Sequence, residues 1–275
     1  MKSFLYFFLF FSFLTNGFAQ KSLLQLENDS LNATDKDWER FNRDNKIYKS
    51  NMEFVFDCSI VKNSDSLQCQ LSKQEYGIPN WQLLTPQNAD SLTVNRIGLL
   101  ILPYYMNDNQ TGMKLRYYNK KGRIIEDFEA TGLVENDKNV WLHPMRWQFF
   151  AITEFNSFPY IKAPYVVGTK WQAGLGIGYF DSYKRFGLTW DGVLDSKEDL
   201  EIIDKVALPT ALGNLECFVI QGLCKTKLTD TKTFFYFNET YGFVKIVYDL
   251  FDKTRLELNL KEVKTKVQTP PPFRF

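Results

Sequence analysis

The sequence predicts a mainly β protein, in which a curved antiparallel sheet forms a half-barrel or open barrel after a short N-terminal helix. Three observations predict this class. Apolar and polar residues alternate with a period of two through many segments, as they do in half-buried strands. Clusters of Gly, Asn, Asp and Pro separate these segments. The chain also contains 25 Phe and 14 Tyr residues, which suit the pleated surface of a sheet.

The first residues have the composition of an export signal. Met1-Lys2-Ser3 carries one positive charge, an apolar run follows from Phe4 to Leu14, and small residues stand at Gly17 and Ala19. The run has about half of the roughly 20 apolar residues that a membrane span needs. We therefore expect residues 1–19 to be a signal peptide cleaved after Ala19, and the mature chain to be extracytoplasmic, either periplasmic or released.

The mature chain is expected to carry no net charge. Removing Lys2 from 33 basic and 32 acidic residues leaves 32 of each sign, and no basic cluster stands out. Such a chain has no long-range attraction for phosphate backbones, so nucleic acid is not an expected partner. No later segment is apolar enough to be expected to span a bilayer.

A polar segment, residues 20–49, precedes the predicted sheet. Within it, Thr34-Asp35-Lys36-Asp37 fits a capping box and predicts a short helix through Trp38 and Phe41. The antiparallel β domain is expected to span residues 50–265.

The first predicted hairpin joins an alternating strand from Met52 to Cys58 with another from Leu67 to Leu71, through a turn at residues 62–65. Pairing Ile60 with Leu67 keeps one face apolar, whereas a slip by one residue would mix the two faces.

The same register places Cys58 directly across from Cys69. Because export permits disulfides, we predict a Cys58–Cys69 bond, with two free buried thiols as the alternative. Cys217 and Cys224 would lie about 23 Å apart in an extended strand, so they should not bond unless the chain reverses at Gly222, and their redox state is left open.

More strands are predicted towards the C-terminus, and the last four form the clearest pattern, an antiparallel meander. Residues 158–164 contain two prolines, which remove donors from a strand ladder, so we interpret them as a rigid connection with a subdivision of the domain left open near Ala163. A proline-rich tail, residues 266–275, ends the chain. The predicted strands are 96–106, 113–119, 123–131, 147–155, 169–180, 215–228, 233–237, 243–250 and 255–263.

Motifs that specify chemistry are sparse. His143 is the only histidine and no Gly-x-Ser-x-Gly motif accompanies it, so we expect a structural role for it, no catalytic residues and no metal site. Gly174-Leu175-Gly176-Ile177-Gly178 has the wrong spacing for a dinucleotide loop and is interpreted as a coiled strand, so no cofactor is expected. A carboxylate glycosidase stays open as a less favoured alternative. Its candidate carboxylates are Glu126, Asp127, Glu129, Glu135 and Glu154.

Six stretches carry a resemblance to a known group of proteins. They are Ala130–Asn136, Val140–Pro144, Asn156–Lys162, Gly168–Trp171, Gly213–Ile220 and Phe235–Lys245. The chain resembles uncharacterised exported proteins of Bacteroidota, domains of unknown function whose curved sheet is similar to that of lipoprotein-carrier proteins. The resemblance covers under half of the chain. It implies a curved antiparallel sheet in an extracytoplasmic protein, and it brings no catalytic residues.

A curled sheet leaves a concave face that side chains, a helix or a ligand must fill. We hypothesise a non-enzymatic exported protein of the cell envelope that binds an apolar or amphipathic ligand there, such as a lipid or a lipidated protein. The alternative is a structural or protein-interaction module that uses strand edges or the tail. Ligand identity and oligomeric state stay open. The expected ligand-contacting residues are Phe218, Ile220, Phe235, Phe237, Phe243 and Val247.

Overall fold

The computed structural model describes residues 45–71, 81–107, 110–127 and 129–269. The expected signal peptide and the expected helix through Trp38 and Phe41 lie outside these residues, as does most of the proline-rich tail.

Fifteen strands form one sheet, and a separate two-stranded sheet joins β11 to β12. Three 3₁₀-helices complete the described structure: η2 (Pro86–Asn88), η3 (Gln148–Phe155) and η4 (Asp181–Phe186). The strands are β1 (Glu53–Lys62), β2 (Asp65–Gln70), β3 (Gln82–Leu84), β4 (Arg96–Asn107), β5 (Gln110–Tyr118), β6 (Ile124–Glu126), β7 (Ala130–Glu135), β8 (Asn139–Leu142), β9 (Tyr160–Lys162), β10 (Lys170–Ala173), β11 (Gly176–Gly178), β12 (Val193–Asp195), β13 (Lys197–Thr210), β14 (Gly213–Lys225), β15 (Asp230–Asn238), β16 (Gly242–Asp249) and β17 (Thr254–Lys264).

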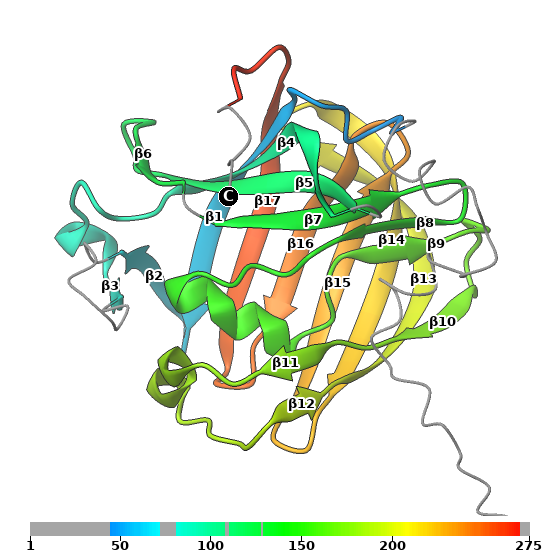
Figure 1. Ribbon diagram of the computed structural model, residues 1–275. Helices are drawn as coiled ribbons and strands as arrows, with labels where there is room; N and C mark the ends of the chain where they lie inside the picture. The colour runs from blue at the N-terminus through cyan, green and yellow to red at the C-terminus, as the bar shows by residue number, and fades with distance from the viewer. Residues whose placement is uncertain (1–44, 72–80, 108–109, 128, 270–275) are drawn as a thin grey trace, which may run out of the picture.

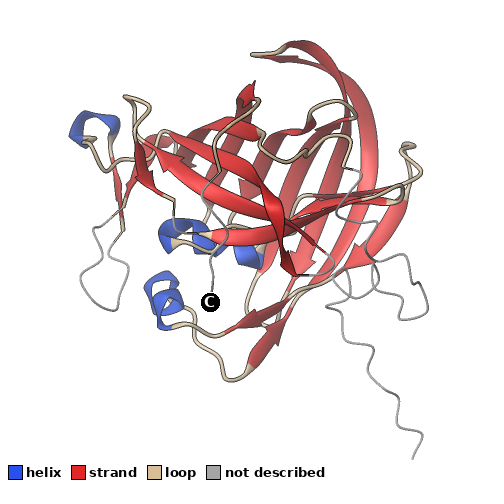
Figure 2. Cartoon of the chain, turned by 45° about the horizontal axis from the view of Figure 1, so that its top comes forward, coloured by secondary structure: helices blue, strands red, loops and turns tan. Residues whose placement is uncertain are grey.

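The large sheet curls on itself into a nearly closed antiparallel barrel (Figures 1 and 2). Its hydrogen-bonded path runs β10-β13-β14-β15-β16-β17-β1-β4-β5-β7-β8-β9. The two ends of this path, β9 and β10, are not paired with each other, which leaves one open seam. The predicted mainly β class and the curved antiparallel sheet are therefore confirmed.

Local patterns placed the first hairpin and the C-terminal meander correctly. Ile60 pairs with Leu67 across the β1–β2 hairpin, whose two turn residues, Asn63 and Ser64, have positive φ. Strands β14 to β17 follow one another as antiparallel neighbours, as predicted. These elements are set by short-range turns and by the sorting of apolar residues to one face.

Other predicted elements differ from the structure. The predicted strand 147–155 is the helical segment η3, and the predicted connection 158–164 contains the short strand β9. The predicted strand 169–180 is divided between β10 and β11, and 123–131 is divided between β6 and β7. The long strand β13 was not predicted, because charged residues interrupt its apolar alternation.

The predicted Cys58–Cys69 disulfide is not present in the structure, where all four cysteines are free thiols. The register that pairs β1 with β2 stops at Ile60 and Leu67. Beyond it, the Cys58 N–H donates to the Asn95 carbonyl at 2.9 Å, and the Cys69 carbonyl accepts from the Val94 N–H at 2.8 Å. The backbone leading into β4 therefore enters between the two strands and separates the cysteines.

The interior face of the sheet is aligned in rows across neighbouring strands. One row runs Leu200, Gly222, Thr233, Tyr248 and Leu256 from β13 to β17. The space above Gly222 is taken by Ser157, because a Cβ atom built on that glycine would lie 2.5 Å from the Ser157 Cβ. Residues from the segment after η3 thus fill the interior of the barrel.

Candidate functional site

Five of the six expected ligand-contacting residues share the interior face. Phe218, Ile220, Phe235, Phe237 and Phe243 are all buried within one continuous apolar core. A ring that sequence reasoning missed, Tyr165 from the β9–β10 loop, contacts Phe218 and Phe237 at centroid distances of 5.9 and 5.4 Å.

The sixth residue, Val247, lies on the opposite face. Its partners in the neighbouring strands are Phe234 and Glu257, whose side chains meet Lys232 and Lys245 on the outside of the barrel. A bulge at Tyr236/Phe237 shifts the pairing of β15 with β16 by one residue, which exchanges the faces of β16 beyond it. The structure therefore places Val247 apart from the other five expected residues.

The segment η3 covers the concave face of the curled sheet (Figure 1). All eight of its residues are buried. Phe150 stacks on Tyr117 of β5 at 5.2 Å, and the Phe155 carbonyl accepts a hydrogen bond of 2.7 Å from the Thr231 hydroxyl of β15. The segment therefore links two different walls of the barrel and occupies the space between them.

The local structure of η3 is held by its surroundings. A 3₁₀-helix of eight residues is unusually long, because its hydrogen-bond geometry is poorer than that of an α-helix. The segment begins at Gln148 with φ of 50°, a left-handed conformation that non-glycine residues adopt at a cost. At its other end the Asn156 side-chain amide donates to the Thr233 hydroxyl and the Asp249 carbonyl, at 3.2 and 3.1 Å.

A buried pair of carboxylates fastens η3 at one side. The Tyr117 hydroxyl donates to Glu129 at 2.6 Å, and the backbone N–H of Arg146 donates to the other Glu129 oxygen. The Arg146 Nε and the Tyr183 hydroxyl donate to the two oxygens of Glu154. Both carboxylate side chains are buried, whereas the Arg146 side chain is 42% exposed.

Burial changes the acidity of both carboxyl groups. It raises the pKa of Glu129 to about 7, against the opposing hydrogen bonds from Tyr117 and Arg146, and the nearby Glu154 adds to the rise. Burial also raises the pKa of Glu154, while Arg146 opposes the rise. A pair that holds a proton near neutral pH has the acidity of an acid–base couple. Each of its four oxygens already accepts a hydrogen bond from the protein, however, which is the arrangement of a structural fastening.

The remaining candidate carboxylates have other partners. Glu135 accepts backbone N–H bonds from Lys46, Ile47 and Tyr48 at 2.6, 2.9 and 2.9 Å, which anchors the start of the described chain to β7. Asp127 forms an ion pair with Lys114 at 3.1 Å. Glu126 accepts the backbone N–H of Asp127 at 2.9 Å. Of the five candidates, the structure brings only Glu129 and Glu154 into one cluster.

His143 and the glycine-rich segment have structural surroundings. The His143 Nδ1 lies 3.2 Å from the Pro144 carbonyl, and burial together with the charge of Arg146 lowers the pKa of the imidazole to about 3. The ring is therefore neutral at physiological pH.

Residues 176–178 of the glycine-rich segment form strand β11. The described residues contain no group of three or more His, Cys, Asp or Glu side chains suited to a metal ion.

A further buried carboxyl group, Glu198 of β13, was not singled out from the sequence. Its side chain is inaccessible to solvent, and neither of its oxygens has a hydrogen-bond partner. Burial raises its pKa well above the ordinary value, and weaker interactions with the Phe158 backbone N–H and the Ser157 and Ser196 hydroxyls, which fall outside regular hydrogen-bond geometry, oppose the rise. Burial of Glu198 therefore favours its neutral form over its charged form.

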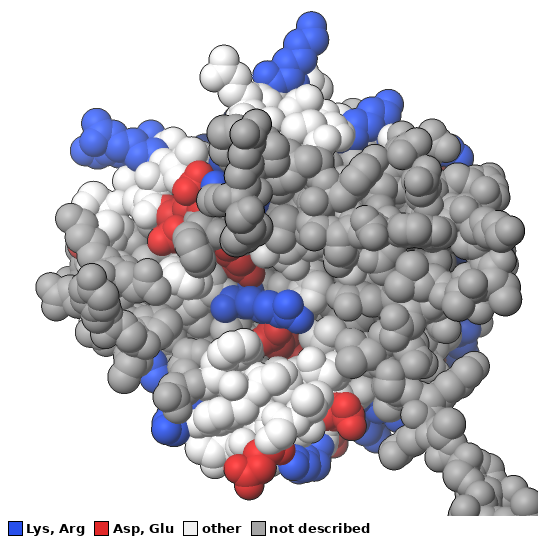
Figure 3. All heavy atoms as spheres, viewed as in Figure 1, with Lys and Arg blue, Asp and Glu red and all other residues white. Residues whose placement is uncertain are grey.

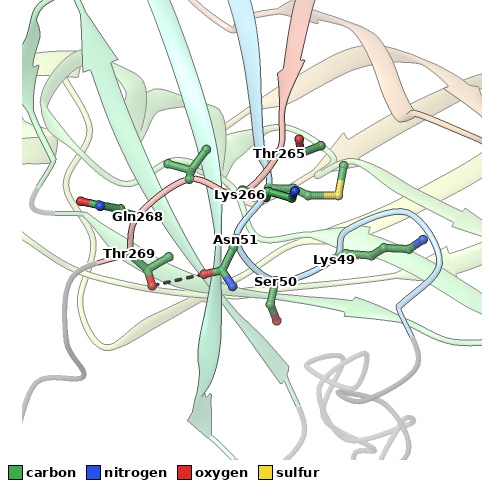
Figure 4. A pocket seen from close by; sticks show the side chains of 9 residues that line it. Lys49, Ser50, Asn51, Thr265, Lys266, Gln268 and Thr269 are labelled. Carbon is green, nitrogen blue, oxygen red and sulfur yellow. Dashed lines mark hydrogen bonds between the residues drawn. The ribbon is translucent and has the colours of Figure 1, made fainter.

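A cavity of about 680 Å³ lies at the end of the barrel where β1 begins and β17 ends (Figure 4). The turn before β1 and the segment after β17 form its two walls, and the Thr269 hydroxyl joins them by a 3.3 Å hydrogen bond to the Asn51 side chain. Its lining residues are Lys49, Ser50, Asn51, Met52, Thr265, Lys266, Val267, Gln268 and Thr269.

Charges of both signs are interspersed over the described part of the face in Figure 3. The described residues also contain no helix that is both long and apolar enough to cross a membrane.

Comparison with known proteins finds solved structures that are similar to this chain at low identity. No family model matches the chain, and no curated protein matches it. Three solved structures are similar over about four fifths of this chain. A candidate lipoprotein of Parabacteroides distasonis has a TM-score of 0.42 and 10% identity, covering 81% of this chain and 100% of its own. A candidate exported protein of Bacteroides fragilis with a YmcC-like fold has a TM-score of 0.39 and 8% identity. The similarity covers 82% of this chain and 99% of that protein. The hypothetical lipoprotein YmcC of Escherichia coli has a TM-score of 0.32 and 10% identity. The similarity covers 82% of this chain and 92% of that protein. All three similarities are at low sequence identity and at TM-scores below 0.5.

Proposed function

We propose that this chain is a non-enzymatic exported protein of the cell envelope that holds an apolar or amphipathic ligand on the concave face of its sheet, in the space that η3 occupies. Export rests on the signal-like residues 1–19. The ligand class rests on the apolar lining contributed by Phe218, Phe235 and Phe243.

One observation carries the proposal. The aromatic concave face is covered by a long 3₁₀-segment that starts at the left-handed Gln148, and not by a further paired strand. Such a segment has little stability of its own and is held by its surroundings, so an apolar ligand that replaces its contacts can take its place. A ligand that binds only the displaced state shifts the equilibrium by its affinity for that state.

The proposal that the chain is not an enzyme rests on the carboxylate pair. Glu129 and Glu154 are buried, and the protein itself uses all of their oxygens. We expect no turnover of a panel of chromogenic glycosides. Turnover that disappears in Glu129→Gln or Glu154→Gln, with the fold intact, would instead identify a glycosidase.

Ligand binding is tested on protein purified from an exported preparation. Native mass spectrometry followed by organic extraction identifies a bound lipid, and titration with the fluorescent fatty acid cis-parinaric acid measures binding directly. Hydrogen exchange should show that residues 148–158 lose protection on binding, whereas β16 and β17 keep theirs. An empty protein that does not bind the probe would refute the proposal.

A hydroxyl deletion sharpens this test. Thr231→Val removes the hydrogen bond to the Phe155 carbonyl and keeps the side-chain shape. If the ligand displaces η3, loosening η3 by about 1 kcal/mol should tighten probe binding about fivefold. Thr210→Val is the matched control, since its hydroxyl donates to the Gly213 carbonyl in the β13–β14 turn, away from η3.

A protein-interaction module of the envelope is the second candidate. It is favoured by the completeness with which the chain covers its own concave face, because a filled interior leaves the outer surface for contacts. Deleting residues 269–275 should remove a tail-bound partner in envelope crosslinking while thermal unfolding stays unchanged. Retention of every crosslink would argue against the tail.

A further inference from the structure

A row of polar side chains crosses the interior face of the barrel. Glu198 of β13 pairs with Cys224 of β14, which pairs with Thr231 of β15, and all three side chains are buried. Leu200 and Gly222, two residues away on β13 and β14, belong to the interior row described above. Because residues two apart in a strand share a face, the polar row faces the same interior.

The chain that leaves η3 covers this polar row. Ser157 lies over Gly222 of β14, and the Phe158 backbone N–H interacts weakly with Glu198 of β13. These residues continue directly from the end of η3. A ligand that displaces η3 would therefore uncover the polar row as well as the aromatic part of the concave face.

Four buried oxygen atoms in this region have no hydrogen-bond partner among the described residues. They are both carboxyl oxygens of Glu198, the Ser157 hydroxyl and the side-chain carbonyl of Asn156. Glu198 and Ser157 are 0% exposed and Asn156 is 1% exposed. An unpartnered buried oxygen is costly and uncommon in a folded protein, so a cluster of them indicates a place that accepts hydrogen bonds from a further group.

The charged form of Glu198 also lacks a cationic partner. Among the described residues, the side chains that stabilise it are the uncharged hydroxyls of Ser157 and Ser196. The buried Glu53, by contrast, lies with its Oε1 3.7 Å from the Nη1 of Arg116. A positively charged donor placed beside Glu198 would supply both the missing hydrogen bonds and the missing charge.

The polar row stands at one end of the apolar lining proposed to contact the ligand. Ile220 and Phe218 precede Cys224 by four and six residues along β14, on the same interior face. Six residues of a strand span roughly 20 Å. The interior therefore has a polar end at Glu198 and an aromatic remainder, which suits a ligand with a polar head and an apolar chain.

We propose that the polar head of this ligand is a hydrogen-bond donor, of which a primary ammonium group fits best, and that it binds Glu198 while the chain lies along the aromatic face. The head-group assignment rests on the ligand function proposed above and adds the chemistry of one end of the ligand. A carboxylate or phosphate head is disfavoured, because it only accepts hydrogen bonds and repels an ionised Glu198.

The test compares decylamine, decanol and decanoate, which share one apolar chain, on the mature protein. At pH 7 the amine carries a positive charge, the alcohol is neutral and the carboxylate is negative. Isothermal titration calorimetry measures the Kd of each ligand. We expect decylamine to bind at least about tenfold more tightly than decanoate, with decanol between them. This ranking on the parent protein requires no variant.

Two matched variants assign the preference to Glu198. Glu198→Gln keeps the size of the side chain but cannot carry a charge, so it should reduce the preference for decylamine over decanol about tenfold. Glu201→Gln removes a carboxylate from the opposite face of the same strand, where Glu201 pairs with Lys170 at 3.3 Å, and should bind all three ligands as the parent protein does. Thermal unfolding of both variants establishes that their fold is retained.

The outcomes separate the head group from the ligand function itself. Equal Kd values for the three ligands would overturn the head-group assignment and leave the ligand function in place, with ordered water satisfying the buried oxygens. Tightest binding of decanoate, or an unchanged preference in Glu198→Gln, would also overturn the assignment. Absence of binding by all three ligands would refute the ligand function and the head group together.

Discussion

Replacing Glu129 by glutamine should change how the stability of this protein depends on pH. Burial raises the pKa of Glu129 from an ordinary value of 4.5 to about 7. The folded state therefore holds this proton more tightly than the unfolded chain does. The resulting stabilisation is complete below pH 4.5 and is lost as the pH rises to 7.

The size of the effect follows from the shift. One pKa unit corresponds to about 1.4 kcal/mol, so a rise from 4.5 to about 7 corresponds to about 3 kcal/mol of unfolding free energy lost across this range. Glutamine cannot ionise, and its amide can still accept from the Arg146 N–H and donate to the Tyr117 oxygen. The stability of Glu129→Gln relative to the parent protein should therefore rise by about 3 kcal/mol between pH 4.5 and pH 7 and stay level above it.

Urea unfolding followed by tryptophan fluorescence measures this difference at a series of pH values. Equal slopes of free energy against urea would establish that both proteins unfold over the same surface. Glu239→Gln, in the exposed β15–β16 turn, controls for the loss of a surface carboxylate. A difference between parent and Glu129→Gln that stays constant from pH 4.5 to 7.5 would refute the burial of this carboxyl group.

Three further predictions follow from other buried groups. Glu198→Gln should raise the melting temperature at alkaline pH, because burial raises the pKa of Glu198 and its ionisation at high pH then destabilises the folded protein. Equal melting temperatures of the parent protein and this variant at pH 9 would contradict the burial of Glu198 without a hydrogen-bond partner. The three buried cysteines, Cys69, Cys217 and Cys224, should resist a thiol reagent at pH 8 until the protein is unfolded, since burial raises the pKa of Cys217, for example, to about 11. A mass two units lower than that of the reduced chain would reveal a disulfide instead. Gly222→Ala should destabilise the fold by about 1–3 kcal/mol, because its Cβ would lie 2.5 Å from the Ser157 Cβ. Adding Ser157→Gly should restore much of that loss in a double-mutant cycle, and independent effects of the two changes would argue against the contact.

Much of the sheet was predictable because its pattern is local. The two-residue turn at Asn63 and Ser64 and the sorting of apolar residues set the pairing of Ile60 with Leu67. The alternation along β17 and the turns between β14 and β17 likewise indicated the meander. Each of these signals acts between residues that are close in the chain or directly opposed across a turn.

The secondary structure of segment η3 could not be predicted from its local sequence pattern. Gln148 to Phe155 is apolar and rich in aromatic residues, so it matches a buried strand as well as a buried helical segment. Its helical form depends on contacts with Tyr117 and Thr231, which belong to distant strands. Likewise, the face of Val247 depends on a bulge in the β15–β16 pairing, which alternation along a single strand cannot reveal.

The sequence by itself determined that this protein is mainly β, that its sheet is antiparallel and curved, and that its last four strands form a meander. The tertiary structure decided that Glu129 and Glu154 share one arginine and that Glu198 is buried. The physical reason is one of range. Strand alternation and turns depend on residues that are close in the sequence. Charge pairing, burial and cavities depend on residues that are far apart in the sequence and that only the folded sheet brings together.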